Sequence, residues 1–141
     1  RDCKRREAVA DSVEEGSSQG DAAEAVMTAL GDVAGLVQIQ EQSTVSRTVL
    51  RAEGVRLVLF AFDAGETLTE HTAAMPVLLQ SLEGEMQITG GDDTFVLRPG
   101  DVIHMDTRLP HSVTALTPAK LLLTMLDSRA TPKHTRAGLG V

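Results

Sequence analysis

The sequence predicts an all-β domain, folded as an antiparallel sandwich or barrel, and three observations support this prediction. From about residue 36 onward, short apolar or alternating segments recur at intervals typical of strands. Turn residues separate these segments, and no stretch with helical periodicity interrupts the series. The 141-residue chain is long enough for one domain with a core, and with only 2% aromatic residues that core must be aliphatic.

Residues 1–35 precede the strands and are predicted to form an N-terminal extension with a short helix. Residues 1–20 are polar and end in a Gly/Ser cluster that is typical of a linker, although residues 5–15 are compatible with a helix. Residues 21–30, DAAEAVMTAL, predict the short helix, because Asp21 is a good N-cap and Glu24 follows it with capping-box spacing. Gly31 is suited to ending this helix.

Residues 36–128 are predicted to form the β domain. The predicted strands are LVQIQ (36–40), SRTVLRA (46–52), VRLVLFAF (55–62), PVLLQSLEG (76–84), EMQITG (85–90), TFVLR (94–98), DVIHM (101–105), HSVTAL (111–116) and KLLLTML (120–126). The GGDD sequence at 90–93 is a strong hairpin signal between two of these strands. Residues 129–141 are polar and predicted to be a loosely held C-terminal tail.

Charge and cysteine content exclude several classes of function. The formal net charge is -7 and no basic stripe offsets it, which argues against nucleic-acid binding. The single cysteine, Cys3, excludes a disulfide within the chain and a zinc site built from cysteines. We find no apolar run of membrane-spanning length and no signal-peptide pattern, so we expect no membrane partner and a cytoplasmic location.

Histidines are the main candidates for chemistry, because the chain has no HExxH, dinucleotide-binding, P-loop or nucleophile-elbow motif. The four histidines are His71, His104, His111 and His134. Any site that uses them must arise when strand pairing brings distant residues together. His134 lies in the predicted tail and is expected to be exposed.

Residues 65–84, GETLTEHTAAMPVLLQSLEG, resemble the first motif of the cupin superfamily, G-x5-H-x-H-x3-4-E-x6-G. Gly65, His71 and Gly84 match this motif at the right spacing. The position of its second histidine holds Ala73, and the position of its glutamate holds Val77.

The second cupin motif, G-x5-P-x-G-x2-H-x3-N, is matched in part by the segment that begins with PGD at 99–101. Gly100 and His111 match, whereas Asp106, Arg108 and Ala115 replace the motif's proline, glycine and asparagine. The resemblance covers about residues 45–126 and implies a double-stranded β-helix, or jelly-roll barrel, similar to the small single-domain cupins. It also implies a homodimer. Independently of the resemblance, an open sheet of aliphatic strands has edges that need to be covered, and strand exchange or side-by-side packing through residues 36–52 would cover them.

The resemblance implies only part of a metal site. In metal-binding cupins, three histidines and a glutamate hold a divalent ion, often iron, manganese, zinc or nickel. Only His71 and His111 carry over, and a catalytic ion generally needs about three protein ligands. His104 is the best candidate for a third ligand, although the sequence does not show which face of its strand points inward.

The sequence is compatible with three functions and does not decide whether the protein is an enzyme. The first is a small-molecule-binding barrel with an apolar interior. The second is a metal-dependent enzyme of the dioxygenase, isomerase or decarboxylase type, and the third is a metal-free enzyme with a histidine as general base. We favour the first, with a pocket formed by His71, Ala73, Val77, Leu79, Met105 and His111.

Overall fold

The computed structural model describes residues 24–127, and contacts within the chain divide it into two units between Gly35 and Leu36. In the first unit, the described residues 24–31 have no regular secondary structure. The predicted helix over residues 21–30 is therefore wrong across its described part. An isolated helix of this length is only marginally stable, and the exposure of Val26 (57%) and Met27 (75%) shows that no apolar packing supports one here. The possible helix at 5–15 and the predicted tail at 129–141 lie outside the described residues.

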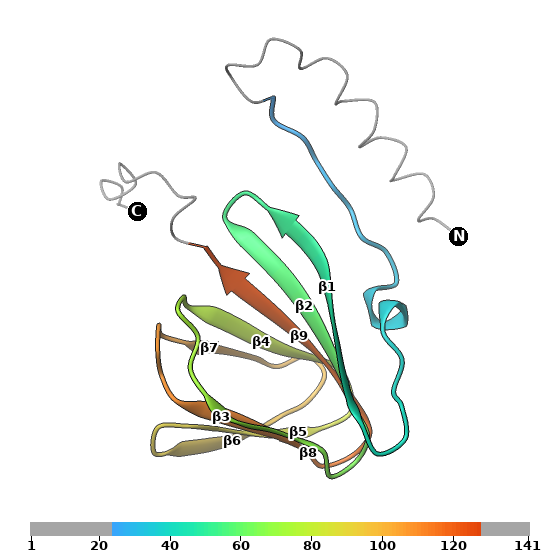
Figure 1. The fold of residues 1–141 in the computed structure, drawn as a ribbon, viewed down its shortest axis with the longest axis vertical. Helices are drawn as coiled ribbons and strands as arrows, with labels where there is room; N and C mark the ends of the chain where they lie inside the picture. Colours follow the sequence, from blue (N-terminus) through green and yellow to red (C-terminus); the bar gives the residue numbers. More distant parts are fainter. Residues whose placement is uncertain (1–23, 128–141) are drawn as a thin grey trace. The chain divides into compact units, whose positions relative to one another are not determined.

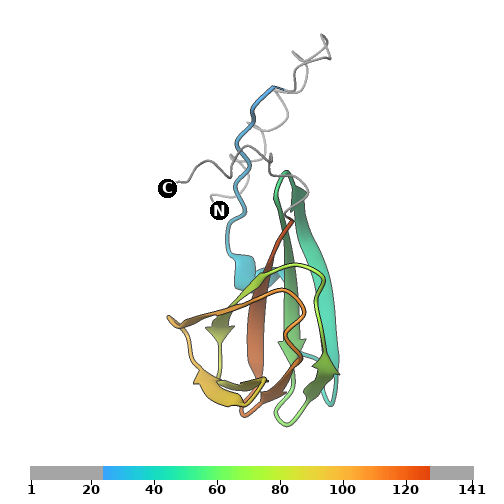
Figure 2. The same cartoon turned by 90° about the vertical axis from the view of Figure 1, so that its left-hand side faces the viewer.

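The second unit contains two antiparallel sheets that face each other (Figures 1 and 2). Sheet A consists, in spatial order, of β1 (Thr44–Ala52), β2 (Val55–Phe62), β9 (Ala119–Leu126), β4 (Val77–Glu83) and β7 (Val102–Met105). Sheet B consists of β3 (Thr67–His71), β8 (His111–Ala115), β5 (Met86–Gly90) and β6 (Asp93–Leu97). The prediction of an all-β jelly roll is confirmed. The described helical structure is limited to the 3₁₀ helix η2 (Val33–Leu36).

Two strand predictions differ from the structure. Residues 37–40 form no strand; instead the Nη1 atom of Arg47 donates a hydrogen bond of 2.7 Å to the carbonyl oxygen of Leu36, and Val37 is buried. An alternating pattern of five residues does not distinguish a strand from an extended segment that buries one side chain. Strand β3 was not among the predicted strands, because its sequence TLTEH is mostly polar and four of its five residues are exposed.

The chain that leads into β1 is anchored to the turn after β2 through Asp63. The carboxylate of Asp63 accepts hydrogen bonds from the backbone N–H groups of Gln42 (2.8 Å) and Ala64 (2.9 Å). These two bonds hold the pKa of Asp63 below its ordinary value of 3.8, because they stabilise the ionised carboxylate. The backbone N–H of Asp63 donates in turn to the carbonyl oxygen of Ser43. Hydrogen bonds of Asp63 therefore link the segment before β1 to the turn after β2.

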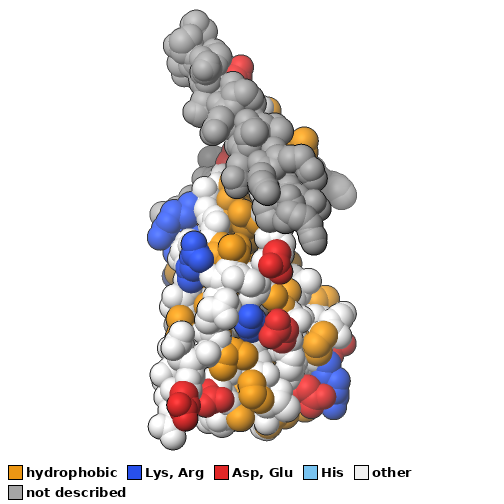
Figure 3. All heavy atoms as spheres, turned by 90° about the vertical axis from the view of Figure 1, so that its right-hand side faces the viewer, with side chains coloured by type: hydrophobic (Ala, Val, Ile, Leu, Met, Phe, Trp, Pro, Cys, Tyr) orange, Lys and Arg blue, Asp and Glu red, His pale blue; other side chains and the backbone are white. Residues whose placement is uncertain are grey.

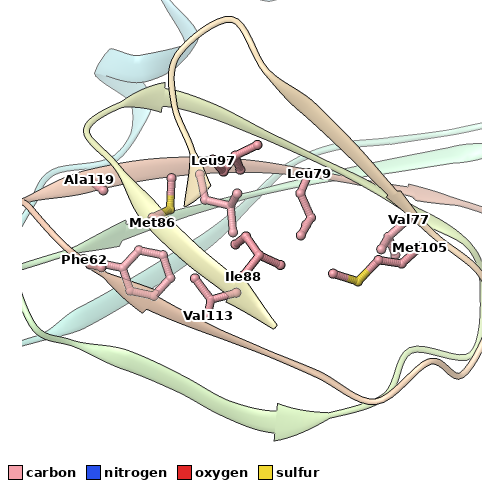
Figure 4. Close-up of a cluster of buried hydrophobic side chains, with 11 residues drawn as sticks. Phe62, Val77, Leu79, Met86, Ile88, Leu97, Met105, Val113 and Ala119 are labelled. Carbon is pink, nitrogen blue, oxygen red and sulfur yellow. The ribbon is translucent and has the colours of Figure 1, made fainter. Parts of the chain in front are cut away.

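The core lies between the two sheets and is almost entirely aliphatic, as the composition requires (Figure 4). In β2, β4, β5, β7, β8 and β9, alternation places every second residue on this inner face. The buried core residues are Phe62, Val77, Leu79, Met86, Ile88, Leu97, Met105, Val113, Ala115, Ala119 and Leu121. The residues that alternate with them lie on the outer faces, where Leu59 and Ala61 of β2 are nevertheless buried. On the β1 side of the barrel, Figure 3 shows hydrophobic side chains interspersed with charged ones.

Gly84 ends β4 at a position that accepts no other residue without strain. Its φ of 77° lies in the left-handed region, and a Cβ atom there would lie 2.8 Å from the Cα atom of Ala119 and still closer to the carbonyl oxygen of Pro118. The motif glycine at this position is thus explained by a turn that packs tightly against the start of β9.

Candidate functional site

A cavity of about 260 Å³ opens between the two sheets, at the end of the barrel where β3 finishes and β4 begins. Residues of β2, β3, β4, β8 and β9 form its wall, and the loop after β3 closes one side. The cavity is lined by Phe60, Leu68, His71, Thr72, Ala73, Ala74, Val77, Leu79, His111, Val113, Leu121, Leu123 and Met125.

An irregularity in β3 turns His71 toward this cavity. In the pairing of β3 with β8, Leu68 lies opposite Val113 and His71 lies opposite His111, so that β3 contains one extra residue between these pairs. In a regular strand, Leu68 and His71 would point to opposite faces. The β-bulge restores His71 to the inner face, and both residues line the cavity.

His71 and His111 form a cross-strand pair in close contact. Their ring centroids are 4.3 Å apart, and the ring planes are tilted by 59°. The Nδ1 atom of His71 lies 2.8 Å from the carbonyl oxygen of Thr69, and the Nδ1 atom of His111 lies 2.8 Å from that of Leu109. A carbonyl oxygen only accepts hydrogen bonds, so Nδ1 carries the proton in both rings.

The second ring nitrogen, Nε2, has no hydrogen-bond partner among the described residues in either histidine. His111 is only 6% exposed, whereas His71 is exposed. No buried side-chain nitrogen or oxygen in the described chain lacks a partner, so Nε2 of His111 must border accessible space. The pair therefore presents two ring nitrogens with free lone pairs, one at the mouth and one deeper in the cavity.

The rest of the cavity wall is uncharged. Among the described residues that line it, none is Asp, Glu, Lys or Arg, and Thr72 is the one polar side chain besides the two histidines. Ala73 and Val77, which replace the motif's second histidine and its glutamate, both line the cavity. Their small apolar side chains leave space where longer polar ones would have projected.

The loop between β7 and β8 borders the same region. The backbone N–H of Arg108 donates a hydrogen bond of 2.8 Å to the carbonyl oxygen of Ala73. Arg108 adopts a left-handed φ of 63°, which explains why the second cupin motif has glycine at this position.

The structure brings together five of the six predicted pocket residues. The five that line the cavity are His71, Ala73, Val77, Leu79 and His111. Met105 instead packs in the core at 3% exposure and borders a separate, smaller cavity of about 120 Å³.

His104, the proposed third metal ligand, lies away from the histidine pair. It pairs with Leu78 on β4, whereas its neighbour Met105 pairs with Val77, whose side chain is in the core. Directly paired residues share a face, so His104 points to the outer side of sheet A. It is exposed and borders an open groove between β6 and β7.

Because His104 lies away from the pair, His71 and His111 are the two described histidines available for the metal ion that some cupins hold. Two imidazole nitrogens are present at the cavity, and the residues described include no group of three His, Cys, Asp or Glu side chains that is suited to a metal. A catalytic ion generally needs about three protein ligands, and a carboxylate helps to balance its charge. The donor set at His71 and His111 therefore does not fit the metal centre that the motif describes.

Sequence reasoning missed eight residues of the cavity wall. They are Phe60, Leu68, Thr72, Ala74, Val113, Leu121, Leu123 and Met125. Alternation within β2, β8 and β9 would have found those on these strands, since they share parity with known core residues. Alternation does not predict Leu68, because the bulge in β3 interrupts the alternation.

Comparison with known proteins agrees with the motifs. A family model described as the cupin domain matches residues 58–125. A cupin superfamily protein of Desulfitobacterium hafniense has a similar structure, with a TM-score of 0.64 and 26% identity over 74% of this chain and 93% of the other. The protein is a small member of the cupin superfamily.

Two further solved structures support this assignment. A cupin of Desulfovibrio desulfuricans is 31% identical over 64% of this chain and 88% of its own, with a TM-score of 0.58. A cupin barrel domain protein of Leptotrichia buccalis is 27% identical over 67% of this chain and 46% of its own, with a TM-score of 0.62. No curated protein matches the sequence. Within residues 24–127, no helix has the length and apolar character that crossing a membrane requires.

Proposed function

We propose that the protein binds one small, largely apolar molecule inside the barrel, with the polar end of this molecule next to His71 and His111. One observation carries the proposal: an apolar cavity whose polar groups converge at one end. Ligand sites typically combine a mostly hydrophobic wall with a few polar groups that orient the ligand. An engineered cavity of about 150 Å³ holds benzene, so a cavity of about 260 Å³ has room for a two-ring molecule.

Filling the cavity tests this function. Val77 is 2% exposed and lines the cavity, so a Val77→Phe side chain would occupy part of the space. Leu78 is its neighbour on the opposite face of β4, and Leu78→Phe is the matched control. We expect Val77→Phe to weaken binding of a two-ring aromatic probe such as naphthol at least tenfold, measured by fluorescence titration, and Leu78→Phe to leave it unchanged. Equal binding by Val77→Phe and the original protein would place the probe elsewhere and refute the proposal.

The alternative function is a metal-dependent cupin enzyme with His71 and His111 as ligands. The orientation of the two rings favours it, because metal-binding histidines commonly donate one ring N–H to a carbonyl oxygen and leave the other nitrogen for the ion. The missing third ligand argues against it. Metal analysis of protein purified without chelators separates the two functions. One equivalent of iron, manganese, zinc or nickel, lost in both His71→Ala and His111→Ala, would establish the alternative.

We also propose that the protein forms a homodimer through sheet A. The strand β1 is an edge of this sheet, and by register Leu50, Leu57 and Leu122 lie on its outer face. An antiparallel sheet normally exposes a polar outer face. On this face Leu59 and Ala61 are already buried within the chain, whereas the three leucines are half-buried, which supports a partner subunit that completes their cover. Sedimentation at micromolar concentration is expected to give a dimer, and a monomer would contradict the proposal.

A further inference from the structure

We infer that the ligand of this cavity is an uncharged molecule with a hydroxyl group at its polar end, and that the cavity selects against carboxylate and ammonium analogues. This inference rests on the proposed function, namely that the cavity binds a ligand. It adds the chemical class of that ligand, which follows from the Nδ1 hydrogen bonds of the histidine pair and from the absence of charged side chains in the described wall.

The histidine pair offers hydrogen-bond acceptors and no donors to the cavity. The proton of each ring is on Nδ1, where the backbone carbonyl oxygens of Thr69 and Leu109 accept it. Each Nε2 therefore presents a lone pair. A ligand that satisfies a lone pair must bring its own donor, and a hydroxyl group is the simplest uncharged donor.

A carboxylate would meet no cationic partner at this end of the cavity, where, among the described wall residues, the hydroxyl of Thr72 is the one side-chain donor that is not already engaged. Both Nδ1 protons are already engaged, and neither Lys nor Arg is among the described residues of the wall. Taking an unpaired ion out of water into apolar surroundings costs far more than the burial of its hydrocarbon part returns.

An ammonium group finds acceptors in the two Nε2 atoms but no counter-charge, because neither Asp nor Glu is among those wall residues. The desolvation cost of its charge therefore remains uncompensated. A hydroxyl group avoids both penalties, since it supplies a donor and carries no charge. Its oxygen also remains free to accept a hydrogen bond from water at the mouth.

Burial assigns His111 as the principal acceptor. His111 is 6% exposed and continues into the apolar wall through Val113 on the same strand face, whereas His71 is exposed. Water satisfies an exposed nitrogen in the free and the bound protein alike, so a hydrogen bond to it adds little. The deeper nitrogen loses its water when a ligand enters, and it then depends on the donor that the ligand brings.

Four probes of one shape test the inference: naphthol, naphthalene, naphthoate and naphthylmethylammonium. The protein contains neither Trp nor Tyr, so naphthalene fluorescence can be followed without background from the protein. We expect naphthol to bind about tenfold more tightly than naphthalene, the difference that one net hydrogen bond provides. Both charged probes are expected to bind more weakly than naphthalene.

Two substitutions identify the acceptor. His111→Phe removes the nitrogen and keeps an aromatic ring, so naphthol should then bind no better than naphthalene. His111→Gln keeps an acceptor and should preserve part of the preference for naphthol. His71→Phe is expected to have the smaller effect of the two Phe variants. Circular dichroism shows whether each variant is folded, and the ranking of the four probes on the original protein decides the inference even if a variant fails to fold.

The possible failures are distinguishable. If naphthalene binds as tightly as naphthol, or if naphthoate or the ammonium probe binds best, the ligand class is wrong while the proposed function stands. If none of the four probes binds, or if Val77→Phe has no effect on any of them, the proposed function itself fails, and this inference fails with it.

Discussion

The two ends of the barrel interior share strands and alternation but differ in how they are filled. Strand β2 contributes Phe60 and Phe62 to the same inner face, and their rings stack with centroids 6.0 Å apart and planes 14° from parallel. Phe62 is completely buried in the packed end of the core. Phe60, one pleat further along, is only partly buried and lines the cavity.

The two ends differ in the size and polarity of the side chains that fill them. At the cavity end, Ala73 and Val77 replace the larger polar residues of the motif, and two histidines stand where the packed end has aliphatic side chains. A jelly roll can thus hold a dense core and a ligand-sized space between the same two sheets. The following predictions test this contrast, in order of decreasing expected effect.

Replacing the two stacked rings one at a time compares the ends directly. Phe62→Ala is expected to lower the free energy of unfolding by about 3–5 kcal/mol, because it leaves a cavity in a dense core. Phe60→Ala only enlarges an existing space, and it should cost about half as much. Urea denaturation of both variants measures the difference. Equal losses would show that the two ends are packed alike.

At the packed end, we expect any side chain at Gly84 to destabilise the fold. Gly84→Ala forces an L-residue into a left-handed φ and drives its Cβ against Pro118 and Ala119. We expect a loss of about 3 kcal/mol, to which backbone strain and overpacking both contribute. Gly54→Ala is the matched control, because Gly54 has a similar φ of 80° but open space around its Cβ position. A loss no larger than that of the control would exclude the steric part of this explanation.

The cavity end should gain stability from glycine at position 108. Arg108 adopts its φ of 63° at a cost that glycine does not incur. Arg108→Gly is expected to raise the free energy of unfolding by about 1 kcal/mol. Thermal unfolding of the two proteins measures this change. Destabilisation instead would mean that the Arg108 side chain makes a contribution that the backbone geometry does not reveal.

The smallest effect concerns Asp63, which follows β2 next to the packed end. Its pKa is lowered in the folded state, so its charge contributes stability above the ordinary pKa of 3.8, and this contribution is lost as the pH falls through the lower folded-state pKa. Asp63→Asn keeps an oxygen acceptor but removes the charge. We expect the variant to be slightly less stable than the original protein near neutral pH and equally stable in strong acid. A difference that does not depend on pH would refute this account.

The fold was predictable because its signals are local. Alternating strands, turn glycines and the spacing of Gly65, His71, Gly84 and His111 are all visible in the sequence. The meeting of His71 with His111 followed from the cupin resemblance. The helix predicted at 21–30 does not form over its described residues 24–30, because capping residues do not stabilise a short helix without an apolar surface to cover.

The site was predictable only in part, because three of its features depend on tertiary structure. The bulge in β3 decides that Leu68 and His71 share a face, and no residue type in TLTEH indicates it. The orientation of His104 depends on the register between β7 and β4, since a four-residue strand has too few alternations to show which side is buried. The tautomers of His71 and His111 became evident only from the carbonyl oxygens beside them.

The most direct test of this account is the protonation of the two ring nitrogens in His71 and His111. Long-range proton–nitrogen correlation spectra of nitrogen-labelled protein, recorded at mildly alkaline pH and assigned with His71→Phe and His111→Phe, report this property for each ring. The account predicts that both rings carry their proton on Nδ1 and have an unprotonated Nε2 that faces the cavity. A proton on Nε2 of His111 would turn the proposed acceptor into a donor and would contradict the account.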